Sequence, residues 1–91
     1  MSDPARLRPP PGFGGRMALA LTHAVGPGPG MQAAAARRFG VSRTTAHAWV
    51  RGVCFPEIGR IVAICDAAGC TTDWLLRGLG EPPAPAVREA A

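Results

Sequence analysis

Residues 32–52 read QAAAARRFGVSRTTAHAWVRG, and this stretch decides the fold. An alanine-rich segment with high helix propensity ends at Gly40, whose missing side chain allows the positive φ that a tight turn requires. Ser42 then caps a second helical segment, because its hydroxyl can accept a backbone N–H from the first turn. Two short helices joined in this way are the pattern of a helix-turn-helix.

Helical periodicity divides each of these two segments into a buried face and an exposed one. In the first segment Ala35 and Phe39 share a face, and Ala36 beside them is small enough for two helix backbones to cross closely. In the second segment Ala46 and Trp49 share the apolar side. The opposite, polar side of the second segment carries Arg43, Thr44, His47 and Arg51. We expect this polar side to point away from the core.

The position of Arg43 at the start of a helix is unfavourable for stability. The helix dipole places positive charge there, and a cation costs a few tenths to about 1 kcal/mol. A local rule that is broken at an exposed position indicates a functional role. An arginine can hydrogen-bond guanine O6 and N7 or pair with a phosphate, so Arg43 indicates a contact with nucleic acid.

The charge distribution agrees with a contact to a polyanion. The 91 residues, enough for one domain, include ten arginines, no lysine and six acidic residues, for a net charge of +4. Residues 32–60 hold five arginines against one acid, whereas residues 61–91 carry a net charge of −2. A basic middle segment beside a slightly acidic end suits a polyanion bound on one face.

The rest of the chain is predicted to be all-α, a compact bundle of five short helices without strands. The expected helices cover residues 16–25, 32–39, 43–51, 56–68 and 72–77. The fourth is expected to hold Pro56 in its first turn and to bury Ile58, Ile61, Val62 and Cys65. We expect a flexible N-terminal arm over residues 1–15, a packed domain over 16–80 and a flexible tail over 81–91, because proline and glycine dominate both ends.

Other function classes find little support in the sequence. The three cysteines form no CxxC pair, so neither a metal site nor a disulfide framework is expected, and Cys65 and Cys70 are predicted to be buried thiols. No apolar run approaches the roughly 18 residues of a membrane span. The chain shows no nucleophile–base set and no phosphate-binding loop. We therefore expect a cytoplasmic protein that is not an enzyme and needs no cofactor.

Two blocks of the sequence resemble one family. Residues 32–52 are similar to the helix-turn-helix of the lambda-repressor-like family, found in phage repressors, Cro proteins, bacterial regulators and antitoxins, in the spacing of Gln32, Ala36, Gly40 and Trp49. Residues 56–82, PEIGRIVAICDAAGCTTDWLLRGLGEP, resemble the fourth and fifth helices of that family. The resemblance covers roughly residues 16–82. It implies a sequence-specific regulator, a phage-type repressor or its DNA-binding domain, that binds double-stranded DNA as a homodimer.

The resemblance and the helical periodicity together predict a DNA-binding face. In the family, the residues that match Gln32, Arg43, Thr44 and His47 reach bases or the adjacent backbone. The full predicted site is Gln32, Arg37, Arg38, Ser42, Arg43, Thr44, Thr45, His47 and Arg51.

Two alternative functions remain open. The first is an antitoxin of a toxin–antitoxin pair, which the short, alanine-rich residues 83–91 disfavour as a toxin-binding segment. The second is a helix-turn-helix adaptor for protein contacts, which the basic groups of the polar face disfavour.

Overall fold

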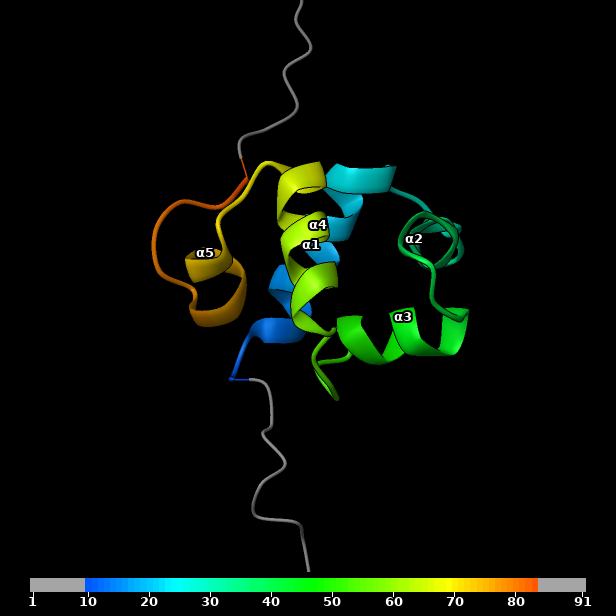
Figure 1. The fold of residues 1–91 in the computed structure, drawn as a ribbon, viewed down its shortest axis with the longest axis horizontal. Coiled ribbons are helices and arrows are strands. Elements are labelled where there is room, and N and C mark those ends of the chain that lie inside the picture. The colour runs from blue at the N-terminus through cyan, green and yellow to red at the C-terminus, as the bar shows by residue number, and fades with distance from the viewer. Residues whose placement is uncertain (1–9, 84–91) are drawn as a thin grey trace, which may run out of the picture.

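The computed structural model describes residues 10–83, so most of the predicted N-terminal arm and tail lies outside the described residues. Between residues 10 and 83 the chain forms five α-helices and no strand, which confirms the predicted all-α class (Figure 1). The helices are α1 (Phe13–Val25), α2 (Met31–Phe39), α3 (Arg43–Val50), α4 (Ile58–Ala68) and α5 (Thr72–Arg77). None of these helices is long and apolar enough to cross a membrane.

Helix α1 is the centre of the bundle. It contacts each of the four other helices, with α4 crossing in front of it, α5 on one side and α2 and α3 on the other (Figure 1). One face of α1 is completely buried and carries Phe13, Met17, Ala20 and Leu21. The other helices therefore take their positions from this apolar face, which supplies much of the hydrophobic stabilisation of the small core.

Helix α1 begins at Phe13, so the predicted start at Arg16 is wrong. The Phe13 side chain is fully buried and packs edge-on against Phe55, with ring centroids 5.1 Å apart. Gly14 and Gly15 are drawn into the helix despite their low propensity, because burial of the neighbouring ring outweighs a cost of about 1 kcal/mol for each glycine.

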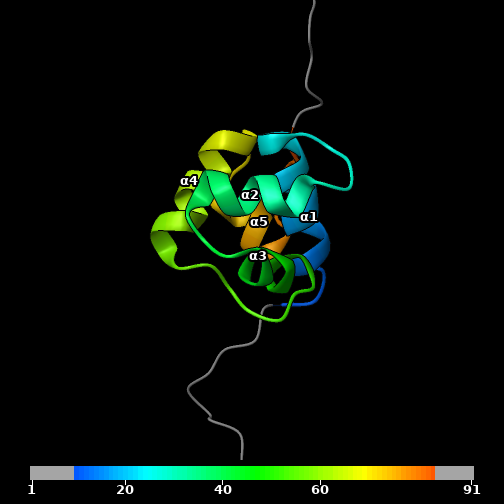
Figure 2. The ribbon, with the colours of Figure 1, turned by 90° about the vertical axis from the view of Figure 1, so that its right-hand side faces the viewer.

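The turn between α2 and α3 forms as predicted. Gly40 ends α2 with a φ of 74°, and the N–H groups of Gly40 and Val41 both donate to the carbonyl of Ala36. Ser42 begins α3, and its Oγ accepts the backbone N–H of Thr45 at 3.0 Å. In Figure 1 α2 is seen end-on while α3 lies across the view, and Figure 2 reverses this, so the two helices cross steeply. The pair is a helix-turn-helix.

The apolar side of the helix-turn-helix faces the core. Ala35 and Ala36 of α2 and Ala46 and Trp49 of α3 are buried, as predicted, and Phe39 is half-buried against the same cluster. Small side chains at this crossing let the two helix backbones approach closely. The polar side of α3 is consequently turned outward.

Helix α4 differs from its prediction in both its start and its face. It begins at Ile58, and Pro56 lies in the preceding connection rather than in the first turn. Ile58 and Val62 were predicted to be buried, but 70% and 47% of their surfaces are exposed. The buried stripe consists of Ile61, Ile64, Cys65 and Ala68. At 100° per residue this stripe is rotated by about 60° from the predicted one, because α4 packs mainly against α1.

Helix α5 has the predicted ends. The Thr71 Oγ1 accepts the Trp74 N–H at 3.1 Å, and Gly78 closes the helix with a φ of 75°. Asp73 lies in the first turn and Arg77 in the last, so both charges are favourable to the helix dipole. Trp74 is buried, as predicted.

Two arginines hydrogen-bond the C-terminal carbonyls of helices that lie far from them in the sequence. The Arg16 guanidinium donates from Nε to the Leu75 carbonyl at 2.9 Å and from a terminal nitrogen to the Leu76 carbonyl at 3.2 Å, both at the end of α5. Arg60 donates from Nε to the Phe39 carbonyl at 2.8 Å, at the end of α2. Cations at helix C-termini satisfy carbonyls that lack a partner within the helix.

Candidate nucleic-acid interface

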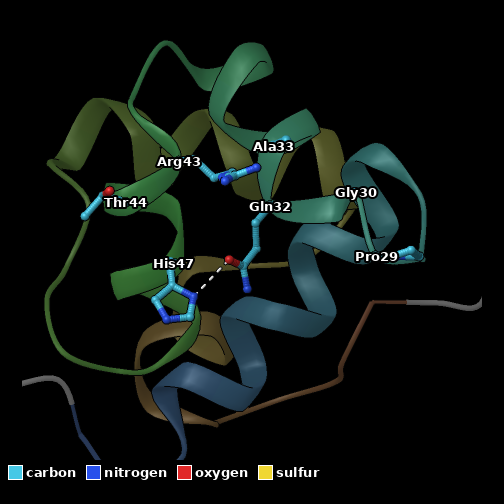
Figure 3. A pocket seen from close by; sticks show the side chains of 7 residues that line it. All are labelled: Pro29, Gly30, Gln32, Ala33, Arg43, Thr44 and His47. Carbon is cyan, nitrogen blue, oxygen red and sulfur yellow. Dashed lines mark hydrogen bonds between the residues drawn. The ribbon is translucent and has the colours of Figure 1, made fainter.

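A hollow of about 450 Å³ opens between the beginning of α2 and the outward face of α3 (Figure 3). Its walls are Pro29, Gly30, Gln32, Ala33, Arg43, Thr44 and His47. The hollow brings together four of the nine predicted site residues, and these four are the ones that the family resemblance aligns with base and backbone contacts. The lining residues that the prediction omitted, Pro29, Gly30 and Ala33, carry no charged or hydrogen-bonding side chain, so no chemical signal in the sequence marks them.

One hydrogen bond joins the two helices across the hollow. The Nδ1 atom of His47 lies 3.0 Å from the Oε1 atom of Gln32, and Figure 3 shows the two side chains turned toward each other. Both residues keep solvent-accessible surface. The bond therefore orients two polar side chains on the outward surface of the helix-turn-helix.

Arg43 lies at the mouth of the hollow. It is exposed, and its side chain extends from the start of α3 toward α2 (Figure 3). The first turn of α2 also has no side-chain cap, since Gly30 precedes it, so backbone N–H groups there have no side-chain acceptor. Residues 10–56 contain no acidic residue. Arg43 and the two helix N-termini give this surface a positive potential.

Ser42 and Thr45 serve mainly to build the end of α3. The Ser42 Oγ accepts the Thr45 N–H and donates to the Thr45 Oγ1 at 3.0 Å. Thr45 is also half-buried, whereas Thr44 beside it is exposed. Of the two predicted threonine contacts, Thr44 is thus the one with a hydroxyl open to solvent.

The remaining predicted residues lie outside the hollow. Arg37 on α2 and Arg51 directly after α3 are exposed, and neither makes a side-chain hydrogen bond or ion pair with another described residue. Arg38 has an internal role, because its guanidinium donates to the Ala24 carbonyl at 3.2 Å and lies 5.6 Å from the centre of the Phe39 ring. Arg37 follows the lining residue Ala33 by one helical turn, and Arg51 follows His47 by the same spacing, so two exposed arginines lie one turn beyond the lining.

The thiols of Cys65 and Cys70 do not line the hollow. Cys65 is buried, as predicted, and Cys70 is half-buried. Burial, with a further contribution from the neighbouring Cys70, raises the pKa of the Cys65 thiol to about 12, and burial also raises the pKa of Cys70. Both groups are neutral thiols at neutral pH, a form that is a poor nucleophile and a poor metal ligand. Among residues 10–83 no group of three potential metal ligands is found.

Comparisons with known proteins establish the fold. No protein-family model and no curated protein matches the chain. The structure is similar to the solution structure of the SOS-response transcriptional repressor LexA from Eubacterium rectale, with a TM-score of 0.55 and 20% sequence identity over 87% of this chain and 86% of that chain. The two chains share a fold.

Proposed function

We propose that the protein is a sequence-specific transcriptional regulator of the phage-repressor type, which binds double-stranded DNA with α3 in the major groove. The observation that carries the proposal is the outward face of α3. Opposite the buried Ala46 and Trp49, this face presents Arg43, Thr44 and His47 to solvent, in a segment of 47 residues (10–56) without an acidic residue. A polyanion with hydrogen-bonding groups along a groove is the ligand that matches such a face.

We assign a role in DNA binding to each helix of the helix-turn-helix. An α-helix fits the major groove, and in helix-turn-helix proteins the N-terminal residues of the second helix reach the base edges. In the proposed complex Arg43 hydrogen-bonds guanine O6 and N7, and Thr44 contacts a phosphate or a thymine methyl. The uncapped start of α2 offers backbone N–H groups to a phosphate. Arg37 and Arg51 add phosphate contacts on either side.

The regulator acts on DNA as a homodimer in the cytoplasm. Helix-turn-helix dimers bind inverted half-sites whose centres lie about 34 Å apart, one helical turn of DNA. LexA, whose fold the chain shares, is named a transcriptional repressor, and this agrees with the repressor type that we propose. No cofactor is required, because every group that we assign to DNA recognition is a side chain or backbone group of the chain itself.

The proposal is tested by selecting bound duplexes from a randomised DNA library at about 150 mM salt and sequencing them. We expect enrichment of an inverted repeat. Arg43→Ala should relax one position in each half-site and leave the half-site spacing unchanged. Arg77→Ala is the matched control, since α5 is exposed at this residue and contacts neither α2 nor α3. It should leave the enriched sequence unchanged.

Other outcomes would favour other functions. Binding without enrichment that disappears as salt rises would indicate only counterion-release attraction and would support the adaptor for protein contacts. An antitoxin would also enrich an operator, but it would in addition form a stoichiometric complex with a toxin expressed from the same operon.

A further inference from the structure

The hydrogen bond between α2 and α3 fixes which nitrogen of His47 carries a proton. The Gln32 Oε1 atom is a carbonyl oxygen and can only accept, so the Nδ1 atom of His47, 3.0 Å away, must be the donor. In the neutral ring the other nitrogen, Nε2, is then an acceptor. Figure 3 shows this second nitrogen on the ring edge turned away from Gln32.

The position of His47 on α3 leaves its Nε2 atom accessible to a base. It lies four residues after Arg43, so the two side chains share one face of α3 at successive turns. Both line the same hollow, and both are exposed. A duplex that receives Arg43 therefore also receives the outer edge of the His47 ring.

We propose, building on the proposed function, that His47 determines one base of the operator through Nε2 and that its preferred base depends on pH. Gln32 is the positioning residue, because it holds the ring through Nδ1. A neutral ring presents an acceptor and selects the amino group of adenine or cytosine. A protonated ring presents an N–H donor and selects the N7 or O6 atom of guanine.

The ring keeps its orientation when it gains the proton. Gln32 Oε1 accepts from Nδ1 in both charge states, so protonation reverses the hydrogen-bonding character of Nε2 alone. The two charge states of the ring therefore differ, toward a base, only in whether Nε2 donates or accepts. Around the hollow, α2 contributes only uncharged side chains, and Arg43 on α3 is the charged group that shares the lining. No carboxylate of residues 10–56 competes for the imidazolium.

The test is the library selection carried out at pH 8.0 and at pH 5.5. We expect one position in each half-site to change from adenine or cytosine to guanine, with a preference of about three- to tenfold for one directed hydrogen bond. His47→Gln should keep a base preference there but lose the change with pH. His23→Gln, which alters the other histidine of the chain, should retain the change. Gln32→Leu should relax this position and no other, an effect that a purely structural link between helices would not have.

A second measurement tests the tautomer without DNA. Nitrogen NMR of the free protein at pH 8.0 should show a protonated Nδ1 and an unprotonated Nε2 for His47, and Gln32→Leu should remove this bias. A protonated Nε2 in the wild type would overturn the inference. An enriched repeat that is identical at both pH values would overturn it while leaving the proposed function standing. Failure to enrich any sequence would overturn both.

Discussion

The position of Arg43 opposes the stability of its own helix, because it lies at the positive end of the helix dipole. Arg16 and Arg60 donate to carbonyls at helix C-termini, where the dipole favours a cation. Arg43 instead lies in the first turn of α3, exposed and without a hydrogen bond or ion pair to another described side chain. The Ser42 cap contributes about 1 kcal/mol and offsets the dipole penalty. Under the proposed function, the partner of Arg43 is a phosphate or a guanine.

Gly14 and Gly15 are adjacent in α1 but have opposite surroundings. A Cβ atom at Gly14 would lie 2.6 Å from the Val50 carbonyl oxygen and 2.8 Å from the Gly52 nitrogen, both backbone atoms at the end of α3. A Cβ atom at Gly15 would meet nothing within 4 Å. The close approach of α1 to α3 thus depends on a single missing methyl group.

We predict that Gly14→Ala lowers the free energy of unfolding by about 1–3 kcal/mol, because α1 and α3 must separate. Gly15→Ala is the control and should raise it by up to about 1 kcal/mol, since alanine favours the helix. Urea unfolding followed by tryptophan fluorescence measures both. Equal stabilisation by the two substitutions would show that the helices do not approach this closely.

At the scale of elements, the sequence predicts the features that depend on local backbone chemistry better than those that depend on packing between helices. The ends at Gly40, Ser42 and Gly78 depend on local backbone chemistry, and the structure confirms them. The start of α1 and the exposed Ile58 depend instead on which helix packs alongside, which periodicity within one segment does not reveal.

The same distinction applies to the candidate site. Gln32, Arg43, Thr44 and His47 were predicted from their faces and from the family resemblance, and the structure brings them to one hollow. The bond from Arg38 to the Ala24 carbonyl was not predictable, because it requires the arrangement of α1 and α2. Arg60 likewise reaches α2 from α4, 21 residues away in sequence from Phe39.

Arg60 is predicted to hold the end of α2 and hence the turn into α3. Arg60→Met keeps the aliphatic stem but removes the donors to the Phe39 and Gly40 carbonyls. We expect a loss of about 1 kcal/mol in the free energy of unfolding and faster amide exchange in the turn. Glu57→Gln is the control, because it removes the exposed ion pair with Arg60 but leaves both carbonyl hydrogen bonds of Arg60 in place; it should cost less than about 0.5 kcal/mol. If both substitutions have equal effects, the ion pair and not the helix cap stabilises this corner.

At the scale of the whole molecule, charge is divided between two groups of helices. Residues 10–56, which form α1 to α3, hold five arginines and no acid. Residues 57–83, which form α4 and α5, hold four acids and two arginines. Under the proposed function, this asymmetry attracts DNA to the helix-turn-helix side and orients the protein before any base is contacted.

This division predicts which arginines set the salt dependence of DNA binding. Each phosphate contact contributes about −0.9 to the slope of log K against log salt concentration. Arg37→Ala and Arg51→Ala should each make the slope shallower by about 1, on specific and non-specific duplexes alike, because both residues are exposed and are proposed to contact phosphates. Arg77→Ala removes the same charge from α5 and should leave the slope unchanged. Fluorescence anisotropy titrations between 50 and 300 mM salt measure the three slopes. An equal change of slope in all three variants would mean that net charge alone attracts DNA. A change of slope confined to the Arg37 and Arg51 variants would support phosphate contacts on either side of α3.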